Sequence, residues 1–296
     1  MGIPKRQKAI EGRFANVDGI AYKMPVDSWE AAALIAAFPC NLAAARKLMP
    51  DGYVHPLNYF GKALLVVTVI DYRQTDIGSY IEYSIAIACT KGRAPAPQLL
   101  PAIFRTSFGT GQFVLDLPVS TEISVKGGRG IWGMPKHQAN LDFAEGSAWI
   151  SSQYDLDGQM VSRFDVRRPS SFRLPLNMGA INYCRFRGMV FRSYIYFQGK
   201  AGLHLLKRGA ARFVLGPHAR ADALRGLEHR PDPLFAAYVP SVRGLLDDYF
   251  DCWFITTAAP TEPPFDPGLE TTFPLGYGQT RLPPPDRDPN FDLGKV

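Results

Sequence analysis

The chain has 296 residues, of which 46% are hydrophobic and 20% are charged, a composition typical of a globular protein with a sizeable core. The 27 glycines and 25 prolines slightly exceed average use, which favours many turns and therefore strands over long helices. The net charge is +6, and the basic excess is densest at residues 163–212. No nucleic-acid-binding signature accompanies this basic run, so we expect no nucleic-acid partner.

The four cysteines lie far apart and form no CxxC pair, and no His-x-x-x-His occurs, so the sequence indicates neither a zinc site nor a disulfide framework. The amino-terminal residues contain no apolar signal segment. The most apolar stretch, residues 31–45, contains Pro39 and is too short to cross a bilayer. We therefore expect a soluble, cytoplasmic protein with free thiols, without a bound metal and without a membrane partner.

Residues 27–49 are rich in alanine and predict a helix that Pro39 divides in two, with Asn41 starting the second part. Apolar and β-branched runs then predict strands at residues 63–72, 80–90, 113–119, 148–156, 189–197, 212–215 and 244–257. Residues 219–227 predict a short helix. The pattern indicates one β-rich α+β domain over residues 1–257 with a small helical layer.

From residue 258 onward the composition changes. Nine prolines fall within residues 258–296, which predicts an extended tail that is either disordered or laid over a neighbouring subunit.

The segment richest in chemistry is residues 125–140, with the sequence VKGGRGIWGMPKHQAN. Its glycines predict a flexible loop that permits close approach, and Pro135 fixes the backbone beside Lys136. Trp132 and Met134 supply apolar walls. The letters of GxGxxG occur here, but no helix is expected after them, so dinucleotide binding is not indicated.

A lysine in a glycine-rich turn is commonly a surface residue, and the alternative is a dehydrated, nucleophilic amine. An ordinary lysine has a pKa of ~10.4, so imine chemistry near neutral pH needs surroundings that favour the neutral amine. Burial acts in that direction, and so does a nearby cation. The adjacent His137 is a candidate for that cation when it is protonated.

Residues 128–137, GRGIWGMPKH, resemble the G-R-E-x-W-G-x-P-K-K signature of the acetoacetate decarboxylase family. Residues 77–82, IGSYIE, are similar to the G-x-Y-x-E segment of that family, and residues 44–50, AARKLMP, are similar to the end of a helix in it. The resemblance covers most of residues 25–145. It implies a β-barrel or cone-shaped sheet, a homo-oligomer, and activity without a metal or an organic cofactor.

By this resemblance Lys136 is the Schiff-base-forming residue and Glu82 is the active-site acid. The other candidate pocket residues are Tyr80, Arg129, Trp132, Met134 and His137. The implied function is a lyase that acts on a keto acid, in particular by decarboxylation of a β-keto acid, through an iminium that serves as an electron sink.

The chain departs from the family pattern at several positions. His137 replaces a second lysine, Gly130 replaces a glutamate, and residues 29–31 and 66–68 lack an expected arginine and glutamate. The basic run at 163–212 and Arg129 are candidates for a replacement carboxylate anchor. These departures leave open an aldolase-dehydratase that uses the same lysine. A barrel that binds a small carbonyl compound without turnover, and an interaction protein, also remain alternatives.

Overall fold

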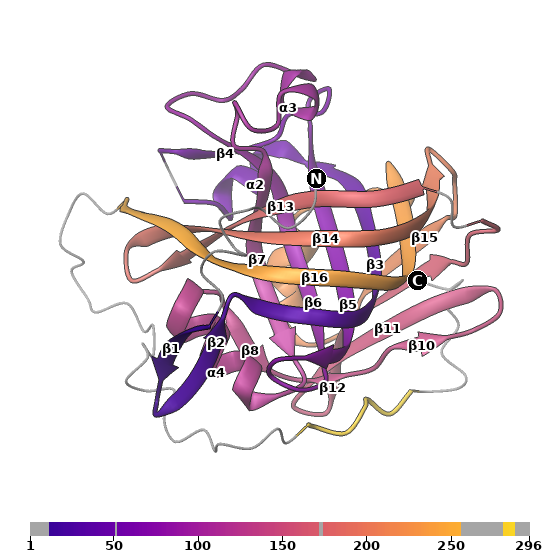
Figure 1. Cartoon of the computed structure of the whole chain (residues 1–296). Helices are drawn as coiled ribbons and strands as arrows, with labels where there is room; N and C mark the ends of the chain where they lie inside the picture. The colour runs from indigo at the N-terminus through magenta and orange to yellow at the C-terminus, as the bar shows by residue number, and fades with distance from the viewer. Residues whose placement is uncertain (1–11, 51, 172–173, 256–280, 288–296) are drawn as a thin grey trace.

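The computed structural model describes residues 12–50, 52–171, 174–255 and 281–287. Seven strands form a closed barrel in the order β6-β5-β3-β16-β14-β13-β7, and β7 pairs back with β6 (Figure 1). These strands are β3 (Val26–Asn41), β5 (Lys62–Thr75), β6 (Tyr80–Lys91), β7 (Gly111–Val119), β13 (Leu174–Phe186), β14 (Met189–Leu205) and β16 (Phe235–Phe254). Closure leaves no free edge among the seven strands. The expected β-rich barrel with few helices is thus confirmed.

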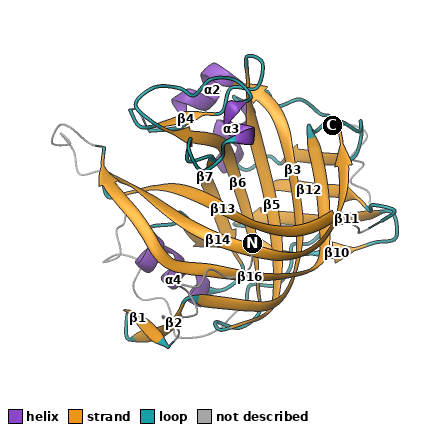
Figure 2. Ribbon diagram, turned by 45° about the horizontal axis from the view of Figure 1, so that its top comes forward, coloured by secondary structure: helices purple, strands orange, loops and turns teal. Residues whose placement is uncertain are grey.

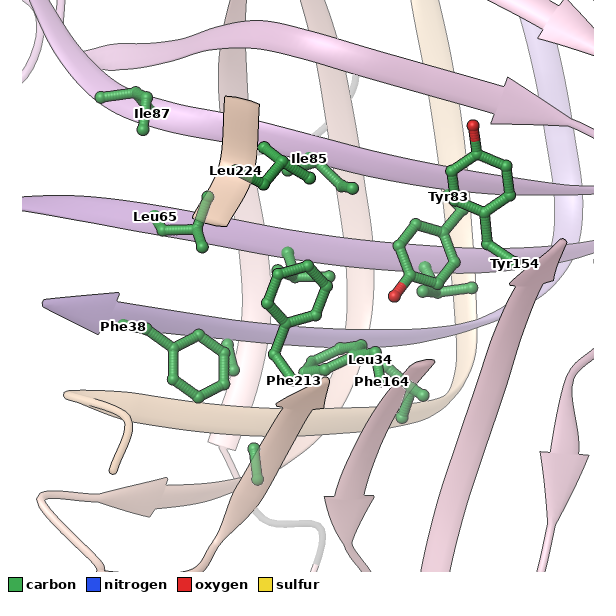
Figure 3. Packing of buried hydrophobic residues seen from close by; sticks show 14 of the residues in the cluster. Leu34, Phe38, Leu65, Tyr83, Ile85, Ile87, Tyr154, Phe164, Phe213 and Leu224 are labelled. Carbon is green, nitrogen blue, oxygen red and sulfur yellow. The ribbon is translucent and has the colours of Figure 1, made fainter. Parts of the chain in front are cut away.

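A second sheet covers one side of the barrel wall. It consists of β10 (Ala144–Glu145), β11 (Trp149–Leu156), β12 (Gln159–Arg167) and β15 (Ala211–Leu215), and β9 (Asn140–Leu141) also pairs with β11. Side chains from the outer face of β3, β5 and β6 pack against this sheet to form the main apolar core (Figure 3). The ring of Phe38 on β3 packs against the rings of Phe164 and Phe213, with centroid distances of 6.5 and 6.3 Å.

The position of this core explains the sequence pattern of the barrel strands. On β5, Leu65, Val67 and Val69 point outward into the core, whereas the alternate residues point into the barrel. Both faces of the strand are covered, which is why residues 63–72 form a continuous apolar run rather than an alternating one. Because the main core lies outside the barrel, the barrel interior is free to hold a cavity.

Short elements close the two ends of the barrel (Figures 1 and 2). One end carries helix α4 (Glu122–Trp132), strand β8 (Lys136–Gln138) and the hairpin of β1 (Arg13–Val17) and β2 (Ile20–Met24). The opposite end carries α2 (Leu42–Lys47), β4 (Val54–Pro56) and α3 (Leu100–Ile103). Within the described ranges, none of the helices reaches the length and apolar character that a bilayer crossing requires.

The helix predicted at residues 27–49 is wrong in its first part. Residues 26–41 form β3, which pairs with β5 on one side and β16 on the other. Pairing with β16 ends at Ala37, so Pro39 lies where its missing N–H costs no ladder bond. The second part is confirmed, because the Asn41 side chain accepts hydrogen bonds from the N–H groups of Ala43 and Ala44 at the start of α2.

The strands predicted between residues 63 and 215 are confirmed as β5, β6, β7, β11, β14 and β15. The last predicted strand, 244–257, overlaps only the second half of β16, which begins nine residues earlier at Phe235. The helix predicted at 219–227 is present as η1 (Ala219–Ala221) and α5 (Asp222–Arg225). All four cysteines are free, and Cys252 is exposed while the other three are buried.

Most of the predicted tail at 258–296 lies outside the described residues, so the domain boundary stays a prediction. The described part, residues 281–287, contacts its own chain. Arg281 forms a β-bridge with Thr121, and the Arg287 guanidinium forms an ion pair with the Asp142 carboxylate.

Candidate active site

Helix α4 brings the chain to Lys136. The helix ends at Gly133, whose φ of 62° lies in the left-handed region that glycine adopts without steric cost. Met134 and Pro135 then lead into β8, where Lys136 pairs with Leu117 of β7 in parallel register. This turn directs the Lys136 side chain into the barrel.

The flexible loop predicted at the glycines of residues 127–133 is wrong, because residues 127–132 belong to α4. Glu122 in the first turn complements the helix dipole, and the glycines allow the helix to pack closely on its neighbours. Gly128 lies against the side chain of Lys136, and Gly130 lies against Val17 of β1. The expectation of close approach is therefore confirmed in a helical conformation.

Lys136 is 4% exposed and has polar partners at its amine. Its Nζ lies 2.7 Å from Oε2 of Glu82 and donates a hydrogen bond to Oγ of Ser124 at 3.0 Å. The same nitrogen lies 5.5 Å from the ring centroid of Tyr80. A buried amine and an acid–base group thus lie within hydrogen-bonding distance.

Two tyrosines stack beside this pair. The rings of Tyr72 and Tyr80 have centroids 4.6 Å apart and are nearly parallel, at 23°. Burial raises the pKa of both hydroxyls well above the usual value, and the negative charge of Glu82 adds to this shift. Both phenols are therefore neutral and remain hydrogen-bond donors.

A cavity of about 490 Å³ fills the barrel interior, and Lys136 and Glu82 line it. Tyr80, Trp132 and Met134 also line this cavity, as the sequence predicts for pocket residues. Trp132 is held in place by a hydrogen bond from Nε1 to the carbonyl oxygen of Asp247, at 3.0 Å. Most of the remaining wall is aliphatic.

The comparisons with known proteins agree with this arrangement. A family model described as acetoacetate decarboxylase matches residues 14–170, more than half of the chain. The chain belongs to the acetoacetate decarboxylase family. No curated protein sequence is significantly similar to it.

Solved structures with the acetoacetate decarboxylase fold resemble the chain at low identity. An acetoacetate decarboxylase structure has a TM-score of 0.58 at 14% identity, covering 79% of this chain and 91% of the other. An acetoacetate decarboxylase from Legionella pneumophila has a TM-score of 0.57 at 12% identity, covering 86% and 96%. The enduracididine biosynthesis enzyme MppR complexed with pyruvate has a TM-score of 0.55 at 12% identity, covering 81% and 93%.

His137, which stands where the acetoacetate decarboxylase signature has a second lysine, does not line the cavity. Successive residues of a strand point to opposite faces, so His137 points away from Lys136. Its Nε2 lies 2.9 Å from the Tyr154 hydroxyl, and its Nδ1 lies 3.5 Å from Oδ1 of Asp116. Burial lowers the pKa of His137, and Asp116 only partly opposes this shift. The prediction of His137 as a pocket residue and as a cation beside Lys136 is therefore wrong.

Arg129 does not line the cavity. Of the described residues 163–171 and 174–212, none of the lysines or arginines lines it either. Arg129 sits in the last turn of α4, where its charge acts on His137. Within the basic run, Arg163 pairs with Asp165 and Arg192 pairs with Asp251. The structure therefore supports neither Arg129 nor the basic run as a carboxylate anchor beside Lys136.

Three further residues lie close to Lys136 and Glu82, and two of them, Ser124 and Tyr72, line the cavity. Ser124 and Tyr72 contact the Lys136–Glu82–Tyr80 group, although only Tyr72, at the end of a predicted strand, had a sequence signal. Cys184 is buried close to the same group, and burial raises the pKa of its thiol to about 12. The thiol is therefore protonated near neutral pH, which makes it a weak nucleophile.

Proposed function

We propose that this member of the acetoacetate decarboxylase family is a carbon–carbon lyase that forms an imine between Lys136 and a keto acid, with Glu82 as the acid–base group. The observation that carries the proposal is the 2.7 Å contact between Nζ of Lys136 and Oε2 of Glu82 inside a largely apolar cavity. A surface lysine such as Lys23, which pairs with Asp76, keeps its hydration, whereas Lys136 is 4% exposed.

Glu82 activates the amine by taking one proton from the Lys136 ammonium, which gives a neutral amine and a carboxylic acid. Apolar surroundings favour this neutral pair, because separated charges lose their hydration there. Nζ then attacks the carbonyl carbon, and the carbonyl oxygen receives the proton held by Glu82 while the nitrogen returns one to it. The C–O bond of this carbinolamine breaks, Glu82 supplies the proton, and water leaves to give the iminium.

The iminium accepts the electron pair of the bond that breaks. In a β-keto acid this is the C–C bond to the carboxylate, so carbon dioxide leaves and an enamine forms. Protonation of the enamine carbon, followed by addition of water to the iminium, releases the product ketone and returns the amine. Ser124 and the neutral Tyr80 hydroxyl offer hydrogen bonds to oxygen atoms near Nζ.

An aldol-type reaction on the same imine is the second candidate. The arginine that lines the cavity, Arg105, lies near Thr110 and Gln112 at the start of β7, whereas Glu82 lies at the other end of β6. A carboxylate held beside Lys136 would therefore face Glu82 rather than a cation. A substrate hydroxyl can instead give its proton to Glu82 while its C–C bond breaks and an aldehyde leaves. The likeness to MppR, whose structure was determined with pyruvate, supports this candidate.

Borohydride trapping tests the imine. The protein is incubated with acetone, pyruvate or acetoacetate, reduced with borohydride and digested, and the peptides are analysed by mass spectrometry. We expect the adduct on Lys136 and not on Lys126, a second lysine that is equally buried at 4% exposure. Lys136→Ala should lose the adduct. An adduct that persists in this variant, or one that forms on Lys126 instead, overturns the proposal.

Product analysis separates the two reactions. Release of carbon dioxide from acetoacetate or a longer β-keto acid supports decarboxylation. Consumption of an aldehyde together with pyruvate supports the aldol-type reaction. Trapping without either turnover favours a barrel that only binds carbonyl compounds.

A further inference from the structure

We infer that the substrate of the Lys136 site is an extended carbonyl compound, with an apolar chain that runs through the barrel from Lys136 toward Arg105. This inference rests on the proposed imine chemistry, because it takes Lys136 as the position of the carbonyl carbon. It adds the size, polarity and direction of the substrate.

The first support is the size of the cavity. Its volume of about 490 Å³ lies within the range of sites that bury whole drug-sized ligands. An apolar protein cavity of roughly 150 Å³ already holds benzene. A molecule with only a few carbon atoms would therefore leave most of this cavity empty, and unfilled apolar space is unfavourable for a tightly packed complex.

The second support is the length of the cavity. Glu82 and Ala88 both line it and lie on the same face of β6. Six residues of a strand span roughly 20 Å at about 3.3 Å per residue. The cavity therefore continues well beyond the Lys136–Glu82 pair, in the direction of the end of the barrel that carries α3 (Figure 1).

The third support is the contrast between the two faces of β3. Its outward residues include Leu34 and Phe38, which fill the main core. Its inward residues Ala33, Ile35 and Ala37 line the cavity. Small side chains on the inward face keep the channel open, while aliphatic neighbours such as Val66 make it apolar. A flexible alkyl or aryl chain matches this lining, because each buried methylene group contributes to binding.

The far end of the cavity is polar. Arg105, Gln112 and Asn182 line it there, and Nε2 of Gln112 donates a hydrogen bond to Oδ1 of Asn182 at 2.8 Å. The Arg105 guanidinium donates to the carbonyl oxygen of Gly179 at 3.4 Å and is otherwise exposed. A guanidinium at this position favours a carboxylate or another oxygen-rich group at the distal end of the chain.

Trapping by borohydride with a series of methyl ketones tests the chain. The series runs from acetone to methyl nonyl ketone, and the ketone concentration that gives half-maximal labelling of Lys136 is measured for each member. We expect this concentration to fall roughly threefold to fourfold for each added methylene group until the channel is full. A flat dependence on chain length, with labelling of Lys136 by acetone intact, overturns the inference and leaves the imine proposal standing.

A graded set of variants locates the chain. Ala37→Val, Ala37→Leu and Ala37→Phe add bulk to the inward face of β3. Ala33 lies at the level of Glu82, because both residues pair with Ile70, and Ala37 lies four residues further along the strand. We expect the longest tolerated ketone to shorten in that order, and the preference of Lys136 labelling for long ketones over acetone to fall with it. Ala223→Phe, at an exposed position of α5, is the control and should change neither value. Unchanged labelling by long ketones in Ala37→Phe overturns the inference.

Displacement of an environment-sensitive apolar dye keeps the test independent of imine formation. If acetone never labels Lys136, the imine proposal fails, and displacement of the dye by long ketones alone still reports the apolar channel.

The distal end of the cavity is tested with Arg105→Gln. This variant should weaken an oxo acid with a terminal carboxylate about tenfold or more and leave the uncharged ketone of equal length unchanged. Equal loss for both ligands overturns the assignment of the distal end.

Discussion

Gly128 and Lys136 are packed so closely that a methyl group added to Gly128 would lie 2.7 Å from Cε of the lysine. Gly128→Ala must therefore displace the lysine stem, and with it the amine that sits 2.7 Å from Glu82. We expect at least a tenfold loss in the rate of borohydride labelling at Lys136. Thermal unfolding should change less, because alanine improves the helix propensity of α4 by about 1 kcal/mol.

Two glycine variants serve as controls for Gly128→Ala. In Gly226→Ala the nearest atom to the new methyl group is the carbonyl oxygen of Ala223 at 3.5 Å, an ordinary contact, so labelling and stability should stay near wild type. In Gly130→Ala the new methyl group meets Val17 at 2.5 Å, which should lower stability more than labelling. Normal labelling in Gly128→Ala would contradict the tight fit between the helix and the lysine.

Glu82→Gln separates imine formation from proton transfer. Glutamine keeps the shape of the side chain and one acceptor oxygen but cannot exchange a proton at neutral pH. The enamine form of a bound ketone exchanges its α-hydrogens with solvent, so deuterium incorporation into acetone, followed by NMR, reports the base. We expect exchange to fall by about 10²-fold or more in Glu82→Gln, the usual contribution of a positioned base. Borohydride labelling should be slower, because Glu82 also transfers protons during imine formation, but it should still reach Lys136 at saturating acetone. Unchanged exchange would transfer the role of base to another group.

The fold could be predicted from the sequence wherever strands are long and covered on both faces. Residues 63–72 and 80–90 form continuous apolar runs and are strands. For residues 26–41 the alanine content wrongly predicts a helix, because alanine has high helix propensity. Their strand conformation depends on pairing with β5 and β16, which a local pattern does not show. Ala33 and Ala37 lie on the inward face that borders the cavity, whereas Ala32 and Ala36 lie on the outward face in the main core. No local pattern in the sequence reports either of these surroundings.

The site was predictable in part for a similar reason. Lys136 and Glu82 were identified through short motifs, and the structure brings their side chains together. His137 was misplaced, because the sequence does not reveal that residue 136 begins a strand, and strand alternation then turns residue 137 to the opposite face. Ser124 lies twelve residues before Lys136 and meets it only because α4 folds back over the barrel end.

Arg220→Ala tests whether the cluster formed by His137, Tyr154, Asp116 and Arg220 acts independently of the Lys136 site. Arg220 forms a bidentate ion pair with the carboxylate of Asp116, which is 6% exposed. Removing the guanidinium leaves that carboxylate buried without its cation, so we expect a loss of about 2 kcal/mol in the free energy of unfolding, less than for a fully buried pair because Arg220 is partly exposed. The double variant Asp116→Asn, Arg220→Ala should recover part of this loss. Labelling of Lys136 by acetone should persist in both. Its loss would couple the cluster to the site.

His229→Phe tests the response of the fold to acid. The His229 ring packs against the rings of Phe38 and Phe213, at centroid distances of 5.8 and 5.4 Å, and its Nε2 donates a hydrogen bond to the carbonyl oxygen of Phe213. Burial lowers the pKa of His229, and the hydrogen bond only partly opposes the shift. The folded state therefore binds fewer protons than the unfolded state once the pH falls below ~6.5, the ordinary histidine value.

The sign of the effect follows from this difference in bound protons. The contribution of His229 is fully present above pH ~6.5 and is lost as the pH falls toward the lowered value in the folded protein, by at most about 1.4 kcal/mol per pH unit. Urea unfolding across this interval should show a smaller decrease in stability for His229→Phe than for the wild type, although the variant loses about 1 kcal/mol at neutral pH with its hydrogen bond. Burial lowers the pKa of His137 as well, so the slope should shrink without vanishing. An unchanged slope would mean that His229 keeps its ordinary titration in the folded protein.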